Sequence, residues 1–164
     1  MKFQRTPILL TVEMEGPIGE TTPMFNLPLA GLKEINLDMS KTTSINSIGI
    51  KQWISWTLKI PADCTVKLVN APFIIAQQAS MVVGFMKANM HLESLRLPYI
   101  CGECDTEHMR EAKRGVDYAY RAEGVPSKIN VPEQTTCPKC GKNSAEPDFL
   151  TEKTFKFLES PVTK

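Results

Sequence analysis

Two Cys-x-x-Cys pairs constrain this chain more than any other feature of its sequence: Cys101 with Cys104 in "CGEC", and Cys137 with Cys140 in "CPKC". A gap of two residues lets both thiolates of a pair point at one ion from a tight turn whose N–H groups donate to the sulfurs. Gly141 follows the second pair and supplies the backbone freedom that such a turn needs. Four thiolates predict a closed tetrahedral zinc site, which contributes folding free energy and does no chemistry.

Two other interpretations of these cysteines stay open. The "CPKCG" segment also suits iron in a rubredoxin-like electron-transfer site, although "CDTEHM" after the first pair lacks the aromatic residues expected around such an iron. Disulfide pairing agrees less well with an odd count of five cysteines, because paired spacing is typical of metal binding in a reducing compartment. We predict that Cys64 is a small residue near a strand end, and that His108 is a neighbour of the metal site and not a ligand.

Composition and charge point to no particular class of partner. Apolar residues make up 42% of the 164 residues, and a net charge of +1 gives no general reason to expect nucleic acid or an anionic membrane. The longest apolar run, around "MVVGFM", is far shorter than the roughly 20 residues that span a bilayer. The first apolar run soon meets glutamates, which does not suit a secretory signal. We therefore expect a cytoplasmic protein with no membrane partner, and the sequence leaves open whether it forms a homo-oligomer.

Residue patterns divide the chain into two predicted domains, 1–95 and 96–164. In the first, strand-like segments at 8–15, 32–40 and 64–70 alternate with helical patterns over about 47–59 and 72–89. An extended segment at 92–100 then leads into the first cysteine pair and is expected to join the two domains. Strands that alternate with helices predict right-handed crossovers and a mainly parallel sheet, so the fold class is α/β.

The helical patterns also predict which side chains face the core. On the first helix the stripe comprises Ile50, Trp53, Ile54, Thr57 and Leu58. Trp56 lies off this stripe, so we expect it to be exposed and to act as a binding hot spot. The second helix is expected to bury Ile75, Ala79, Val82, Val83 and Met86.

The second domain, 96–164, contains all four paired cysteines but few apolar residues. A segment of this kind needs something besides apolar burial to hold it together, and a metal is the usual solution. The segment resembles a zinc ribbon, and the resemblance implies a β-rich structure with two metal-binding turns on neighbouring hairpins. We expect residues 105–136, between the pairs, to form a hairpin or an insertion.

Residues 8–95 are similar to a known family of regulatory domains. The strand "EINLDMS", the helix opening "INSIG" and the segment "TVKLVNAP" resemble the STAS domain, found in bacterial anti-sigma factor antagonists and in the cytoplasmic tails of sulphate transporters. The resemblance implies a four-stranded core sheet with helices on one side. It also implies a role in protein–protein switching and no catalysis.

The family's Asp-Ser-Ser-Gly or Asp-Ser-Thr-Gly motif matches Asn46, Ser47, Ile48 and Gly49. The resemblance implies that Ser47 is the residue that a kinase, itself the anti-sigma factor, phosphorylates. Phosphate there would add about −1.5 to −2 charge and weaken partner binding. In this chain Asn46 stands where the family has Asp, and Ile48 stands where it has a small hydroxyl residue. The residues themselves also predict Ser47 as the N-cap of the helix.

Together these features predict a bacterial, non-enzymatic regulatory module with structural zinc. The expected partner is an anti-sigma factor, a related kinase or another regulator, bound through Asn46, Ser47, Ile48, Gly49 and Trp56. No arrangement of catalytic residues supports an enzyme. The alternative is a nucleic-acid-associated zinc-ribbon protein. Its candidate contacts are Arg110, Lys113, Arg114, Arg121 and Lys128 with Tyr99, Tyr118 and Tyr120, although acidic residues are interleaved with them.

Overall fold

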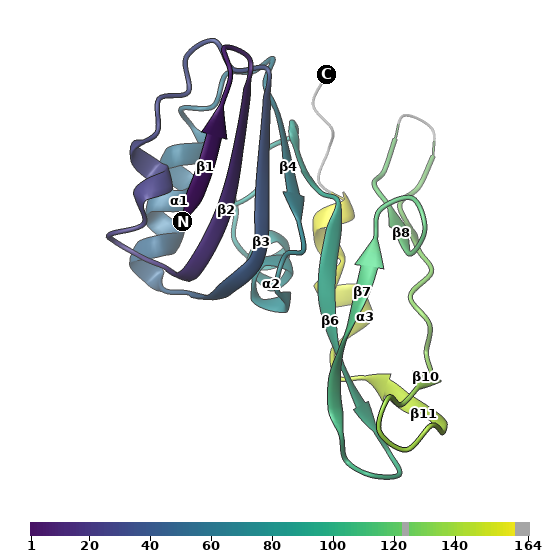
Figure 1. Ribbon diagram of the computed structural model, residues 1–164. Helices are drawn as coiled ribbons and strands as arrows, with labels where there is room; N and C mark the ends of the chain where they lie inside the picture. Colours follow the sequence, from purple (N-terminus) through teal and green to yellow (C-terminus); the bar gives the residue numbers. More distant parts are fainter. Residues whose placement is uncertain (123–124, 160–164) are drawn as a thin grey trace.

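The chain is a mixed α/β protein with two main sheets, described by a computed structural model at residues 1–122 and 125–159 (Figure 1). The first sheet has the order β1-β2-β3-β4-β5, with β2 to β5 parallel and β1 antiparallel to β2. Its strands are β1 (Lys2–Arg5), β2 (Leu9–Ile18), β3 (Glu34–Ile45), β4 (Thr65–Val69) and β5 (Met90–Leu92). The prediction of a mainly parallel sheet is therefore confirmed. The pattern did not predict β1, because its four residues are all exposed and show no alternation.

The second sheet is antiparallel and has the order β10-β11-β6-β7. Its strands are β6 (Ser94–Cys101), β7 (Glu107–Lys113), β10 (Thr135–Thr136) and β11 (Asn143–Pro147). A separate pair, β8 (Tyr118–Ala119) with β9 (Lys128–Ile129), lies in the insertion between the cysteine pairs. The chain then passes through the short helix α3 (Thr151–Thr154) and the 3₁₀ turn η2 (Lys156–Glu159).

The two sheets are connected through β5 and β6, which follow one another in the chain with only Glu93 between them. Glu93 N–H donates to Leu68 O at 2.8 Å, and Ala71 forms a parallel bridge to Leu95. At the edge of β5, Leu92 N–H donates to the Tyr120 hydroxyl and the Tyr118 hydroxyl donates to Leu92 O, both at 2.8 Å. The predicted boundary at 95/96 thus falls inside β6, a strand that contacts both halves.

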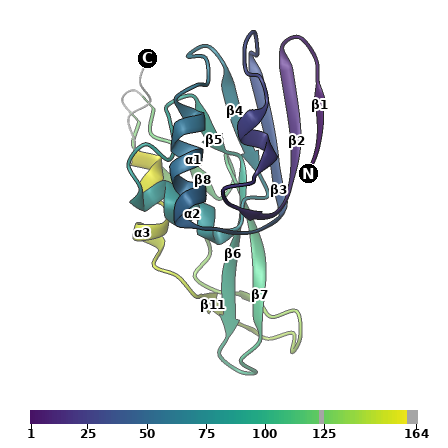
Figure 2. The same ribbon diagram turned by 90° about the vertical axis from the view of Figure 1, so that its left-hand side faces the viewer.

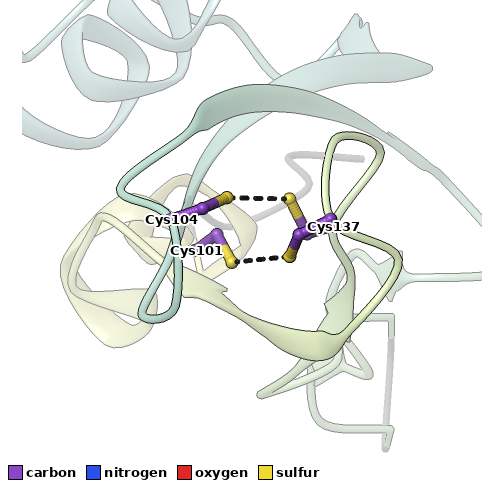
Figure 3. A group of neighbouring side chains, drawn as sticks. Cys101, Cys104 and Cys137 are labelled. Carbon is purple, nitrogen blue, oxygen red and sulfur yellow. Dashed lines mark hydrogen bonds between the residues drawn. The ribbon is translucent and has the colours of Figure 1, made fainter.

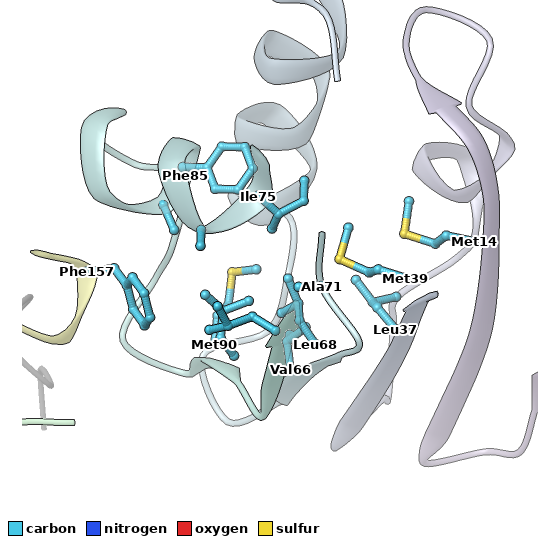
Figure 4. Close-up of a cluster of buried hydrophobic side chains, with 14 of the residues drawn as sticks. Met14, Leu37, Met39, Val66, Leu68, Ala71, Ile75, Phe85, Met90 and Phe157 are labelled. Carbon is cyan, nitrogen blue, oxygen red and sulfur yellow. The ribbon is translucent and has the colours of Figure 1, made fainter. Parts of the chain in front are cut away.

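Helices α1 (Ser47–Thr57) and α2 (Phe73–Met81) lie on the same face of the first sheet, and the 3₁₀ turn η1 (Pro23–Asn26) packs beside α1 (Figure 2). That face of the sheet carries buried apolar residues, including Leu37, Met39, Val66 and Leu68, which meet Ile75 of α2 (Figure 4). Phe157 of η2 lies against Met90 in the same cluster, so the C-terminal segment completes the core of the first sheet (Figure 4).

The buried face of α1 differs from the predicted one. Trp56 is only 1% exposed, so the expectation that it is an exposed hot spot is wrong, whereas Leu58 is 72% exposed. Trp53 is buried as predicted, and its Nε1–H donates to Phe85 O at 2.8 Å while its ring stacks on Phe85. The loop after α2 contacts α1 on this buried side, since Phe85 packs on Trp53 and Gly84 O accepts from the Thr57 hydroxyl, while Trp56 packs against Trp53.

The second helix is shorter than the pattern predicts. It ends at Met81, and Val83, expected in the core, is 96% exposed. Val82 already has an extended backbone (φ −106°, ψ 114°), and Gly84, with a φ of +83°, then turns the chain so that Phe85 enters the core instead. Within the described residues, no helix is both long and apolar enough to cross a membrane.

The N-cap of α1 is Asn46, which corrects the prediction for Ser47. The Asn46 Oδ1 accepts from Gly49 N–H at 2.7 Å, and Ser47 is the first residue of the helix.

We expect Asn46→Ala to lower the free energy of unfolding by about 1 kcal/mol, because a helix N–H loses its acceptor. Ser47→Ala, one residue away and exposed, is the matched control and should stay within about 0.5 kcal/mol of wild type. Chemical denaturation of both variants checks this, and the reverse ranking would restore Ser47 as the cap.

Candidate functional site

The two Cys-x-x-Cys segments form turns with the same backbone hydrogen bonds. In the first, Cys101 N–H donates to Thr106 O at 3.0 Å and Asp105 N–H donates to Cys101 O at 2.9 Å. In the second, Cys137 N–H donates to Lys142 O at 2.8 Å and Gly141 N–H donates to Cys137 O at 3.0 Å. Each turn therefore spans six residues and is closed by the same pair of bonds.

The residue after each second cysteine has a positive φ, which is +72° at Gly141 and +52° at Asp105. Sequence reasoning identified Gly141 but missed Asp105, although Asp105 holds the equivalent place one residue after Cys104. Aspartate is one of the few residues other than glycine that tolerate this conformation. Alignment of the two Cys-x-x-Cys segments would have identified Asp105, because it follows Cys104 as Gly141 follows Cys140.

The turns lie at the ends of neighbouring hairpins, so the four sulfurs converge. Cys101 ends β6 and pairs with Ala145 of β11, which begins shortly after the second turn. All four Sγ atoms lie within 4.8 Å of one another. Cys104 faces Cys137 with their sulfurs 3.7 Å apart (Figure 3). The sulfurs of Cys101 and Cys140 are 3.6 Å apart. These four cysteines could hold a metal ion, and no disulfide joins any of the five cysteines.

Nearby donors favour the charged form of two of these thiols, those of Cys101 and Cys137. The thiol of Cys140 differs: the backbone N–H of Lys142 lowers its pKa, but desolvation and the neighbouring cysteine sulfurs outweigh that effect and raise the pKa to about 11. A hydrogen bond with the Ser144 hydroxyl, 3.2 Å away, and the backbone N–H of Glu103 lower the pKa of Cys101 to about 6. The backbone N–H groups of Cys140 and Lys139 lower the pKa of Cys137. A metal binds the thiolate form, so this environment suits a set of metal ligands. Ser144 is a contributor that the sequence pattern did not identify.

Two further residues that the sequence singled out, His108 as a neighbour of the metal site and Cys64 as a small residue near a strand end, are not among the converging ligand atoms. His108 sits on β7 opposite Tyr99 and does not belong to the group that converges on the sulfurs. Cys64 is buried in the first sheet's core, where burial raises the pKa of its thiol. A buried thiol of raised pKa is typical of a structural residue.

A second candidate site is the turn where β3 gives way to α1. Asn46, Ser47 and Ile48 are exposed, whereas Gly49 is buried. Any Cβ on Gly49 would overlap the carbonyl oxygen of Ile18, so only glycine lets α1 come this close to the end of β2. Asn46 N–H also donates to Ile18 O at 3.2 Å. The exposed hydroxyl of Ser47 and the side chain of Ile48 are therefore presented on a firmly held turn.

The basic and aromatic residues weighed for nucleic-acid binding are largely engaged within the protein. Arg110 pairs with Asp117 at 2.6 Å, and Arg114 pairs with Glu93 at 2.7 Å. Lys113 pairs with Glu111 at 3.1 Å. The hydroxyls of Tyr118 and Tyr120 bond to Leu92 of β5, and their rings pack against Phe155 and Phe157, respectively, so both tyrosines are engaged in internal contacts.

Comparison with protein-family models, with curated proteins and with solved structures finds no match.

Proposed function

We propose that Cys101, Cys104, Cys137 and Cys140 bind one Zn²⁺ whose role is structural. An all-sulfur set of four ligands satisfies tetrahedral zinc and leaves no coordination position for substrate. The two turns share one hydrogen-bonding pattern, and Cys101 and Cys137 are buried. The ion would join the β6–β7 hairpin to the β10–β11 hairpin, as in the zinc-ribbon family.

We further propose that the chain is a non-enzymatic bacterial regulatory module of STAS-like organisation that binds a protein partner. The observation that supports this proposal is the turn at residues 46–49, in which Ser47 and Ile48 are exposed to solvent. Contacts of Asn46 and Gly49 with Ile18 hold this turn against the end of β2. Ile48 is 46% exposed, and the outward side of α1 continues through Lys51 and Ser55 to Leu58. Apolar side chains that are exposed on a fixed helix are suitable anchors for a partner. Leu58 thus takes the place that the sequence had assigned to Trp56.

Phosphorylation of Ser47 is the proposed switch. The residue begins an 11-residue helix, where free N–H groups and the helix dipole stabilise a phosphate. The added negative charge would lie beside Ile48 and oppose burial of that side chain in an interface.

Partner capture tests the surface. We expect full-length tagged protein to retain a specific partner from native bacterial cytoplasm, and Ile48→Asp to lose it, because burying a charge without a counterion is costly. Met109→Asp is the matched control, since Met109 is an apolar residue on β7 that is 60% exposed. Retention of the same partner by Ile48→Asp at wild-type level would refute this surface.

Phosphate transfer tests the switch. A kinase that binds the chain should add one phosphate to wild type and to Ser55→Ala, but none to Ser47→Ala. Intact-protein mass spectrometry reports the added mass, and Ser55 is the control because it lies exposed on the same helix. Phosphorylation that persists in Ser47→Ala would place the modification elsewhere.

A further inference from the structure

We propose that the metal centre is an oxidant-sensitive switch in which a hydroperoxide oxidises Cys140, which then forms a disulfide with Cys101 and releases the ion. This inference rests on the proposed binding of zinc by the four cysteines.

The four sulfurs differ in their access to solvent. Cys140 is exposed and Cys104 is half-buried, whereas Cys101 and Cys137 are buried. Oxidation of cysteine follows thiolate character and exposure. Metal binding makes all four sulfurs thiolates, so exposure decides which one a small oxidant reaches first. That residue is Cys140.

The contacts between sulfurs determine which disulfide follows. The sulfur of Cys140 lies 3.6 Å from that of Cys101, on the other turn, while Cys137 faces Cys104 at 3.7 Å. A disulfide bond is about 2.05 Å long, so the two sulfurs need only close the gap between them once the metal no longer holds them apart. The arrangement therefore favours a bond between the turns over a bond within one Cys-x-x-Cys pair.

The chemistry balances with one hydroperoxide. The Cys140 thiolate attacks the O–O bond, which gives a sulfenic acid and releases hydroxide (or an alkoxide). The Cys101 thiolate then attacks the sulfenic sulfur, forms the S–S bond and displaces a second hydroxide. Two protons from solvent convert the leaving groups to water or alcohol. The two thiolates are oxidised, the peroxide is reduced, and the ion loses two of its four ligands.

The disulfide would also preserve the second sheet. Cys101 ends β6, and Cys140 lies in the turn that leads into β11, so a bond between them joins the same two hairpins that the metal joins. Oxidation should therefore remove the metal without the loss of strand pairing that chelation causes.

The test uses the zinc-loaded full chain, hydrogen peroxide and a chromogenic zinc chelator too weak to strip the site unaided. Trypsin cleaves after Lys139 and a glutamate-specific protease cleaves after Glu103, so all four cysteines fall on separate peptides that mass spectrometry can identify without reduction. We expect one zinc released per Cys101–Cys140 disulfide formed, with the peptide that contains buried Cys64 still reduced. Peroxide that releases no zinc, or that forms Cys137–Cys140 or Cys101–Cys104, overturns the inference while leaving zinc binding intact. A purified chain that holds no metal before peroxide is added overturns both proposals.

Discussion

Cys101→Ser is expected to abolish stoichiometric metal binding and to unfold the second sheet. Structural zinc contributes on the order of 10 kcal/mol of apparent binding free energy, which is folding free energy when the site does not exist in the unfolded chain. Cys101 is both a proposed ligand and the last residue of β6, which pairs with β7 and with β11. Removal of the ion therefore acts on the centre of that sheet. Hydrogen exchange measured by mass spectrometry should show lost protection in β6, β7, β10 and β11.

Chelation of the wild-type protein allows hydrogen-exchange protection to be compared with and without metal, without any substitution. Cys64→Ser is the control for loss of a cysteine. Cys64 lies outside the cysteine cluster, so this variant should keep its full metal content even if packing around residue 64 loosens. Equal protection of the second sheet with and without metal would mean that apolar packing alone holds it.

Trp56→Ala is expected to lower the free energy of unfolding by about 3–5 kcal/mol, the usual cost of removing a large buried aromatic side chain. Trp56 is almost completely buried and lies against Trp53, with ring centroids 5.4 Å apart. The variant tests burial directly, because an exposed tryptophan would cost little. Urea denaturation followed by far-UV circular dichroism gives the difference.

Leu58→Ala is the matched control on the same helix, and we expect a change within about 0.5 kcal/mol because Leu58 is largely exposed. Replacement of each tryptophan by phenylalanine should also have different effects on the free energy of unfolding. Trp53→Phe loses the hydrogen bond to Phe85 O, whereas the Nε1–H of Trp56 has no partner among the described residues. A larger loss in Leu58→Ala than in Trp56→Ala would contradict this packing of α1.

Local patterns predicted most of the first sheet and the cluster of four cysteines because both follow from short-range sequence patterns. Alternation identified β2, β3 and β4, and the order of helices and strands identified the parallel pairing. The spacing of four cysteines identified the group that the fold brings together. In each of these cases the sequence signal, an alternation of apolar residues or a Cys-x-x-Cys pair, lies within a few neighbouring residues.

The errors came from tertiary contacts that a local pattern does not contain. The pattern of α1 suggested Trp56 as exposed, because a local pattern does not contain the tertiary packing that buries Trp56 beside Trp53. The cap was assigned to Ser47 because serine is a good cap, but the close approach of Gly49 to Ile18 places Asn46 at that position. The pairing of Tyr118 and Tyr120 hydroxyls with Leu92 depends on residues that lie far apart in the chain.

Metal analysis of the purified 164-residue chain is the most direct test of whether the four cysteines form a closed structural zinc site. We expect one zinc per chain by native mass spectrometry, with X-ray absorption showing four sulfur neighbours at about 2.3 Å. Iron in place of zinc would support an electron-transfer site, and nitrogen or oxygen ligands would indicate an open site. Either result, or a folded chain with no metal, would contradict a closed structural zinc site built from Cys101, Cys104, Cys137 and Cys140.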